Sequence, residues 1–194
     1  MITSYLILAH LLADFVLQPS KLIRFKTKSP LGVALHVAVF FVLAVIFLFP
    51  YARYWQVWAV IAGISIVHYA ADQIKVYAGS KKETFPLPFV TDQIIHLFSL
   101  IVGGNILDQQ RIGVSANWFY ENIYQNWIVW FLFAFIIFAV YALDIIFLQK
   151  AYLSSYTLKK EDKKNRKRIV HKKLFIFIAV YIMFILSAVL IDCF

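Results

Sequence analysis

The sequence predicts an all-α, polytopic membrane protein with six transmembrane helices, and three observations support this fold class. Hydrophobic residues make up 62% of the 194 residues and charged residues only 15%, whereas soluble domains average about 25% charged residues. The apolar residues gather in six long segments. The basic residues lie in alternate connections between these segments, as they do in membrane proteins. We therefore expect a single integral membrane domain over residues 1–194.

Each of the six segments is close to the roughly 20 mainly apolar residues that a helix needs to cross a bilayer. The segments cover about residues 2–18, 31–50, 56–78, 90–107, 127–149 and 169–192. The first segment lacks a basic start and contains His10 and Asp14, so we predict a span and not a cleaved signal peptide. The fourth segment is short and contains Gly103 and Gly104, which is typical of a tilted, broken or re-entrant helix.

The basic side chains orient these segments. Among the 19 lysines and arginines, only Arg53 and Arg111 lie outside the connections that follow the first, third and fifth segments. Because such basic connections stay in the cytoplasm, both termini are predicted to be extracytoplasmic. The basic stretch 159–173 predicts contact with anionic lipid headgroups. The net charge of +9 is thus explained by topology, and we expect no nucleic-acid partner. A homodimer is also compatible with the sequence.

Seven ionisable residues share one predicted depth, in the cytoplasmic half of the first four segments. They are His10, Asp14, His36, His68, Asp72, Asp92 and His96. Six of the seven form three pairs whose members are four residues apart, so each pair projects from one face of a helix. Ionisable groups at such depth are costly and almost always face a protein interior or a water-filled cavity. We therefore expect these residues to form one shared, buried site.

The first four segments also contain an internal repeat. HLLAD at residues 10–14 and HYAAD at residues 68–72 each precede a basic connection and a second apolar segment. That second segment carries an early histidine, His36 in one half and His96 in the other, 26 and 28 residues after the motif begins. This pattern predicts a pseudo-twofold repeat of helices 1–2 and 3–4 about an axis along the membrane normal. Asp92 has no acidic counterpart, because the matching position lies near Gly32.

Imidazoles and carboxylates without thiolates are the ligand set of zinc, iron, manganese, nickel or copper. The chain has a single cysteine, Cys193, and therefore no thiolate cluster. We predict that the seven His and Asp residues bind a divalent transition metal, with zinc as the first candidate. One metal with the remaining residues as orienting groups, or two metals that share an aspartate, would both fit this set.

A metal-activated water at this depth predicts a hydrolase that acts on a lipid or another substrate at the membrane interface. In this interpretation the catalytic residues are Asp14, Asp72, Asp92 and Lys75, and the substrate-binding residues are Gln18, Gln73, Lys75 and Gln93. The alternative is a proton- or cation-coupled transporter that uses the His/Asp cluster as a relay. Against transport, the polar groups all lie in one leaflet. A purely structural cluster would place too many charges in the membrane.

Four polar blocks occur in order along the chain: HLLADFVLQ, His36, HYAADQIK and FVTDQIIH. In these blocks, roughly residues 1–110, the sequence resembles the bacterial and phage membrane proteins grouped as domain of unknown function 3307. The resemblance implies a multi-pass protein of the bacterial cytoplasmic (inner) membrane, and it implies no activity. The positions that it singles out are His10, Asp14, Gln18, His36, His68, Asp72, Lys75, Asp92, Gln93 and His96.

Overall fold

The computed structural model describes residues 1–79, 87–110 and 124–153, and every regular element in these ranges is a helix. The predicted all-α class is therefore confirmed. The elements are α1 (Ile2–Leu11), which continues into a wide turn η1 (Leu12–Val16), α2 (Ser20–Lys26), α3 (Pro30–Phe47), a short 3-10 turn η2 (Phe49–Tyr51), α4 (Trp55–Gly79), α5 (Leu87–Gln109) and α6 (Trp127–Leu153).

Three helices in the described residues are long and apolar enough to cross a membrane. They cover Pro30–Phe47, Trp55–Tyr77 and Val90–Gln109, and shorter apolar helices cover Ile2–Val16 and Trp127–Val140. The number of six spans and the pseudo-twofold repeat stay predictions. The sixth predicted segment, 169–192, and the basic stretch 159–173 lie outside the described residues.

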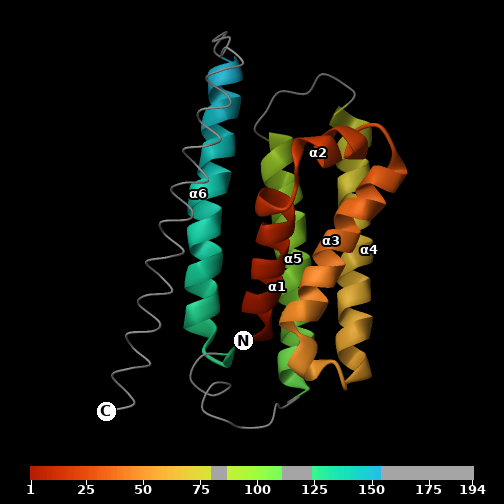
Figure 1. Cartoon of the computed structure of the whole chain (residues 1–194), viewed down its shortest axis with the longest axis vertical. Helices are drawn as coiled ribbons and strands as arrows, with labels where there is room; N and C mark the ends of the chain where they lie inside the picture. Colours follow the sequence, from red (N-terminus) through yellow and green to blue (C-terminus); the bar gives the residue numbers. More distant parts are fainter. Residues whose placement is uncertain (80–86, 111–123, 154–194) are drawn as a thin grey trace. The chain divides into compact units, whose positions relative to one another are not determined.

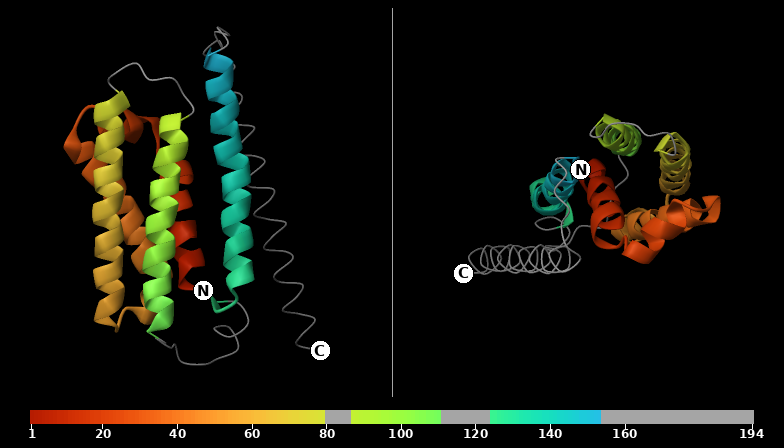
Figure 2. Two further views of the ribbon diagram at one scale, coloured as in Figure 1. Left: turned by 180° about the vertical axis from the view of Figure 1, so that it is seen from behind. Right: turned by 90° about the horizontal axis from the view of Figure 1, so that it is seen from above.

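Helices α1, α3, α4 and α5 form a four-helix bundle, in which α1 and α4 each pack against both α3 and α5 (Figures 1 and 2). The two helices that carry the HxxAD motifs therefore occupy opposite corners of the bundle. The short helix α2 packs against α3 and lies across one end of the bundle, at the top of Figure 1. All of these elements belong to one compact unit, Met1–Ala134, and Phe135–Phe194 forms a second unit.

The bundle is apolar on its outside and polar at one level inside. Leu31 and Phe98 are 67% and 68% exposed, whereas His36 and Asp72 are 0% and 1% exposed. Soluble proteins rarely bury charged groups or expose broad apolar surfaces. An apolar outer surface with ionisable groups inside is typical of a helix bundle surrounded by lipid, where ionisable groups face the protein interior.

The half of the bundle core that lies farther from α2 is hydrophobic. Its buried residues there include Leu6, Ala9, Phe40, Ala44, Ile61 and Leu100. On each helix these residues lie between the site histidine and the helix end farthest from α2. Polar groups in the described bundle interior are thus concentrated toward the α2 end.

Gly103 and Gly104 do not interrupt α5, so, of the alternatives expected for this segment, the broken helix was wrong. A Cβ at Gly103 would lie 2.6 Å from the Ile64 side chain of α4, and a Cβ at Gly104 would overlap Thr3 of α1. Small residues at these positions let α5 approach both diagonal helices closely, as is common where helices pack in membranes. The two glycines therefore serve packing.

The connection between the first and second spans is held tightly against the bundle. Ser29 begins α3 by accepting a hydrogen bond from the Leu31 backbone N–H at 3.2 Å, and Pro30 follows in the first turn. Gly32 also lies in the first turn of α3, and a Cβ there would overlap the backbone of Phe25 and Lys26 in α2. Glycine thus permits the backbones of α2 and α3 to cross in contact, which fixes the end of α2 over the bundle.

Candidate metal site

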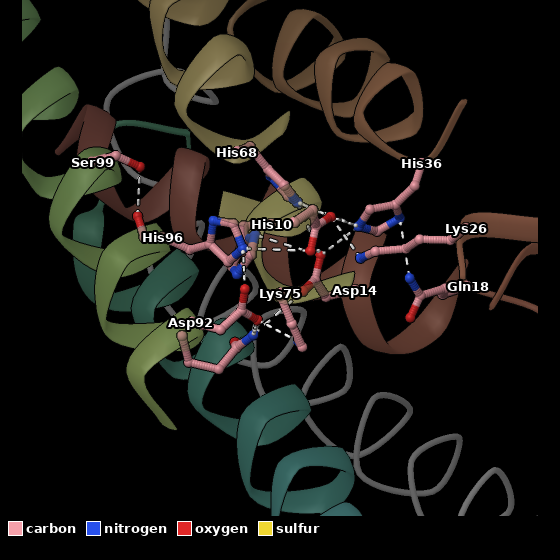
Figure 3. A network of polar contacts seen from close by, with 12 residues as sticks. His10, Asp14, Gln18, Lys26, His36, His68, Lys75, Asp92, His96 and Ser99 are labelled. Carbon is pink, nitrogen blue, oxygen red and sulfur yellow. Dashed lines mark hydrogen bonds and ion pairs between the residues drawn. The ribbon is translucent and has the colours of Figure 1, made fainter. Parts of the chain in front are cut away.

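The predicted histidines and aspartates meet in the interior of the bundle (Figure 3). They form three overlapping groups in which one ligand atom from each residue lies within 4.8 Å of the others. The groups are His10–Asp14–His68, His36–His68–Asp72 and Asp72–Asp92–His96. The ring centroid of His68 lies 4.2 Å from that of His96 and 5.1 Å from that of His10. Side chains from four helices therefore form one continuous cluster.

The wide turn η1 positions Asp14. The Leu17 backbone N–H donates to the carbonyl of Leu12, five residues earlier, at 2.8 Å. Such a turn contains an extra residue and is frequent at functional sites. Asp14 lies inside it, with Oδ1 3.1 Å from His36 Nε2 and 3.6 Å from His10 Nδ1. The second HxxAD motif lies in the regular helix α4, so the two motifs differ in their local backbone.

Four ligand atoms in the cluster have nearly equal spacings. His36 Nε2 lies 3.1 Å from Asp14 Oδ1, 3.3 Å from His68 Nε2 and 3.5 Å from Asp72 Oδ2. His68 Nε2 lies 3.6 Å from Asp14 Oδ1 and 3.5 Å from Asp72 Oδ2. A tetrahedral zinc with bonds of about 2.0–2.1 Å separates its ligand atoms by about 3.3–3.4 Å. These five spacings, 3.1–3.6 Å, lie within about 0.2 Å of the tetrahedral range. We call Asp14, His36, His68 and Asp72 the four-ligand site.

The third group extends the cluster along α5. His96 Nε2 lies 3.3 Å from Asp92 Oδ1 and 3.9 Å from Asp72 Oδ1. Asp92 and His96 are 5% and 1% exposed, so both side chains are withdrawn from solvent. We call Asp72, Asp92 and His96 the three-ligand site. Asp72 belongs to both sites.

Two lysines contact the carboxylates. Lys75 Nζ lies 2.6 Å from Asp92 Oδ2, and Lys26 Nζ lies 2.6 Å from Asp72 Oδ2. Lys75 was expected from the sequence, but Lys26 was not. A lysine in a basic connection resembles any other topogenic charge, so the sequence carries no signal that separates Lys26 from its basic neighbours.

The glutamines take different positions. The Gln18 side-chain amide lies 3.3 Å from His36 Nδ1, and this contact leaves His36 Nε2 directed at Asp14 Oδ1, 3.1 Å away. The Gln93 amide donates to Asp92 Oδ2 at 3.3 Å. Both glutamines therefore orient candidate ligands. The Gln73 amide donates to the Tyr69 hydroxyl at 2.9 Å on the same helix, outside the cluster.

Comparison with known proteins places the chain in a family but supplies no activity. No curated protein and no solved structure matched the chain. Residues 2–129 match the family described as protein of unknown function (DUF3307). This match extends beyond the range of about 1–110 that the motifs suggested, and it includes every residue of the cluster. The chain therefore belongs to the DUF3307 family.

Proposed function

We propose that the protein is an integral protein of the bacterial cytoplasmic membrane whose His/Asp cluster binds a divalent transition metal, with zinc as the first candidate. We propose further that it is a metal-dependent hydrolase acting on a lipid or another substrate at the membrane interface. The observation that carries the proposal is the close approach of the ligand atoms in the four-ligand site, at 3.1–3.6 Å, within a bundle of apolar helices. Two imidazoles and two carboxylates also match the ligand chemistry of zinc.

The hydrogen bonding of the cluster supports a bound cation over a packing role. Both ring nitrogens of His10 and of His96 are buried and make no hydrogen bond within the described residues, although His10 Nδ1 and His96 Nε2 lie 3.6 Å and 3.3 Å from carboxylate oxygens. A polar network that serves only packing is costly when its members stay unsatisfied. A metal ion would use these lone pairs, and three carboxylates beside two ammonium groups leave a net negative charge that attracts it.

The surroundings of Asp92 suggest how a substrate would reach the cluster. The Lys75 side chain is 35% exposed, whereas the side chain of its partner Asp92 is only 4% exposed, so the pair extends from the surface to the interior. In the proposed reaction Lys75 and Gln93 hold an anionic part of the substrate. A metal ion at the three-ligand site would supply an activated water, because that site has one protein ligand fewer than a closed tetrahedral site. Asp92 would accept the proton of this water as the water oxygen adds to the ester carbon or phosphorus. The ester bond to the leaving oxygen breaks, and that oxygen takes up the proton.

A proton- or cation-coupled transporter is the second candidate, and the buried Lys26–Asp72 ion pair favours it. Such pairs are typical parts of intramembrane relays. Transport also requires a path to the other side. The described core beyond His10 and His36 instead contains Leu6, Ala9, Phe40 and Ala44. This apolar layer supports chemistry at one interface over passage through the bundle.

The metal content of the detergent-purified protein tests the proposal, measured by mass spectrometry after growth with added zinc, manganese, nickel or iron. We expect stoichiometric metal in the wild-type protein and a sharp loss in His68→Ala. The matched control is His171→Ala, because His171 lies in the basic stretch outside the motifs. A wild-type protein without metal at neutral pH would remove the hydrolase proposal and move the relay to first place.

Turnover requires a separate measurement. Metal-loaded protein is mixed with phospholipid micelles, and the released products are measured. We expect Asp92→Asn to retain most of the four-ligand metal and to lose hydrolysis. Ser65→Ala is the control, because its hydroxyl only donates to the Ile61 carbonyl of the same helix at 2.8 Å. Metal-independent proton uptake in reconstituted vesicles, without product release, would contradict the hydrolase and support the transporter.

A further inference from the structure

We propose that the cluster holds two metal ions bridged by the carboxylate of Asp72. The first ion occupies the four-ligand site, and the second occupies the three-ligand site, with His10 beside it. This inference rests on the proposed metal-dependent function and specifies how many ions the site takes and which residues hold each of them.

The two oxygens of Asp72 face different groups of ligands. Oδ2 lies 3.5 Å from both His36 Nε2 and His68 Nε2, whereas Oδ1 lies 3.9 Å from His96 Nε2. Asp72 is 1% exposed, so neither oxygen depends on bulk water for its partners. A carboxylate in this position binds one ion with each oxygen. Two-metal hydrolases hold their ions about 3.5–4 Å apart, a separation that a bridging carboxylate can span.

Asp92 and His96 leave unsatisfied atoms at the second position. Lys75 pairs with Asp92 Oδ2 at 2.6 Å, while Asp92 Oδ1 makes no hydrogen bond within the described residues. That oxygen lies 3.3 Å from His96 Nε2, and both His96 ring nitrogens likewise make no hydrogen bond there. The Ser99 hydroxyl donates to the His96 backbone carbonyl and leaves the ring untouched. Buried polar atoms without hydrogen bonds require an explanation. A bound metal ion would explain them, because imidazole nitrogens and carboxylate oxygens are metal ligands.

His10 lies beside the second position and can complete its coordination. Its ring centroid is 4.9 Å from that of His96 and 5.1 Å from that of His68. The ring is 3% exposed, and neither nitrogen makes a hydrogen bond in the described structure. His10 Nδ1 also lies 3.6 Å from Asp14 Oδ1, so His10 contacts the four-ligand site as well. His10 therefore stands between the two positions.

The four-ligand site and the three-ligand site differ in whether a lysine occupies a ligand oxygen. Asp72 Oδ2, a ligand of the four-ligand site, is held by the Lys26 ammonium at 2.6 Å. Binding there requires Lys26 to release this oxygen. At the three-ligand site, Lys75 pairs with the oxygen of Asp92 that faces away from His96, so both Oδ1 atoms stay available. The second position is thus formed before any ion arrives.

Titration with manganese alone tests the proposal, followed by electron paramagnetic resonance of the frozen, detergent-purified protein. We expect two manganese ions per chain and the exchange-coupled signal of a bridged pair. His96→Gln, which keeps a polar side chain of similar size, should bind one manganese with an uncoupled signal. His36→Gln should likewise bind one ion, at the other position. Circular dichroism and a monodisperse elution profile confirm that each variant is folded.

The outcomes separate this inference from the proposed function. One manganese per wild-type chain, unchanged in His96→Gln, would overturn the second ion and leave the four-ligand site intact. Two manganese ions without exchange coupling would overturn the Asp72 bridge. No manganese and no zinc in the wild-type protein would overturn both proposals together.

Discussion

Lys26 and Asp72 show how strongly the site depends on individual side chains. Asp72 is shared by two groups of candidate ligands, and Lys26 holds one of its oxygens at 2.6 Å while being only 8% exposed. Removal of one member of a buried ion pair leaves the other charge uncompensated. In the proposed metal site the ammonium and the ion would compete for the same oxygen, so Lys26 would stabilise the metal-free protein and oppose metal binding.

The substitution Lys26→Met tests this competition. The metal-free variant should lose about 3–5 kcal/mol of unfolding free energy, because the Asp72 carboxylate stays buried without its partner. Its zinc affinity should rise roughly tenfold, which corresponds to about 1.4 kcal/mol. Thermal unfolding with and without zinc, together with calorimetric titration, measures both effects. Lys21→Met is the control, because Lys21 is exposed on the same helix. Unchanged zinc affinity in Lys26→Met would show that the lysine does not compete.

At the scale of the elements, local periodicity was enough to predict some features. His68 and Asp72 are one turn apart on α4, and Asp92 and His96 are one turn apart on α5, so their shared faces follow from the helix period. The shared depth of these residues in the predicted spans, together with their spacing, also predicted that the helices surround one site.

Other features depend on contacts between segments. The sequence did not predict α2 or the wide turn η1, because each is fixed by packing against the bundle. Gly32 shows the reason: in the sequence it is only a weak helix former, whereas in the structure it lies directly against the backbone of α2. The role of Lys26 follows from the same crossing, and no local pattern encodes it.

The substitution Gly32→Ala tests whether the crossing of α2 and α3 positions Lys26. The added Cβ would overlap the backbone of Phe25 and Lys26, so α2 must shift. We expect a loss of about 1–3 kcal/mol in unfolding free energy, as for other overpacked positions, and greater reactivity of the Lys26 amine toward a water-soluble acylating reagent. Gly63→Ala is the matched control, because a Cβ there meets nothing within 4 Å. Equal stability and equal amine labelling in the two variants would contradict this role of Gly32.

At the scale of the whole molecule, the distribution of charge predicts which side of the membrane the site faces. The basic connections follow the first, third and fifth segments, and the lysines at the α2 end of the bundle belong to this set. The cluster therefore lies toward the cytoplasmic interface in the predicted topology. Lipid headgroups and cytoplasmic metal ions would both be within reach at that level.

Reporter fusions test this topology. A reporter after Phe194 should be extracytoplasmic, and one inserted near Lys164 should be cytoplasmic, because six spans return the chain to the side on which it began. Alkaline phosphatase and green fluorescent protein report the two sides with opposite responses. The reverse pair of results would place the cluster at the outer interface and invalidate cytoplasmic access.

X-ray absorption at the zinc edge of the zinc-loaded, detergent-purified protein tests most directly whether the buried cluster is a metal site. The spacings around His36 Nε2 and His68 Nε2 predict four nitrogen or oxygen ligands at about 2.0–2.1 Å, with outer-shell scattering from imidazole rings. His36→Gln should reduce the imidazole scattering, and His171→Ala should leave it unchanged. Zinc that is absent, or present only as a six-coordinate ion without imidazole scattering, would contradict the proposed site.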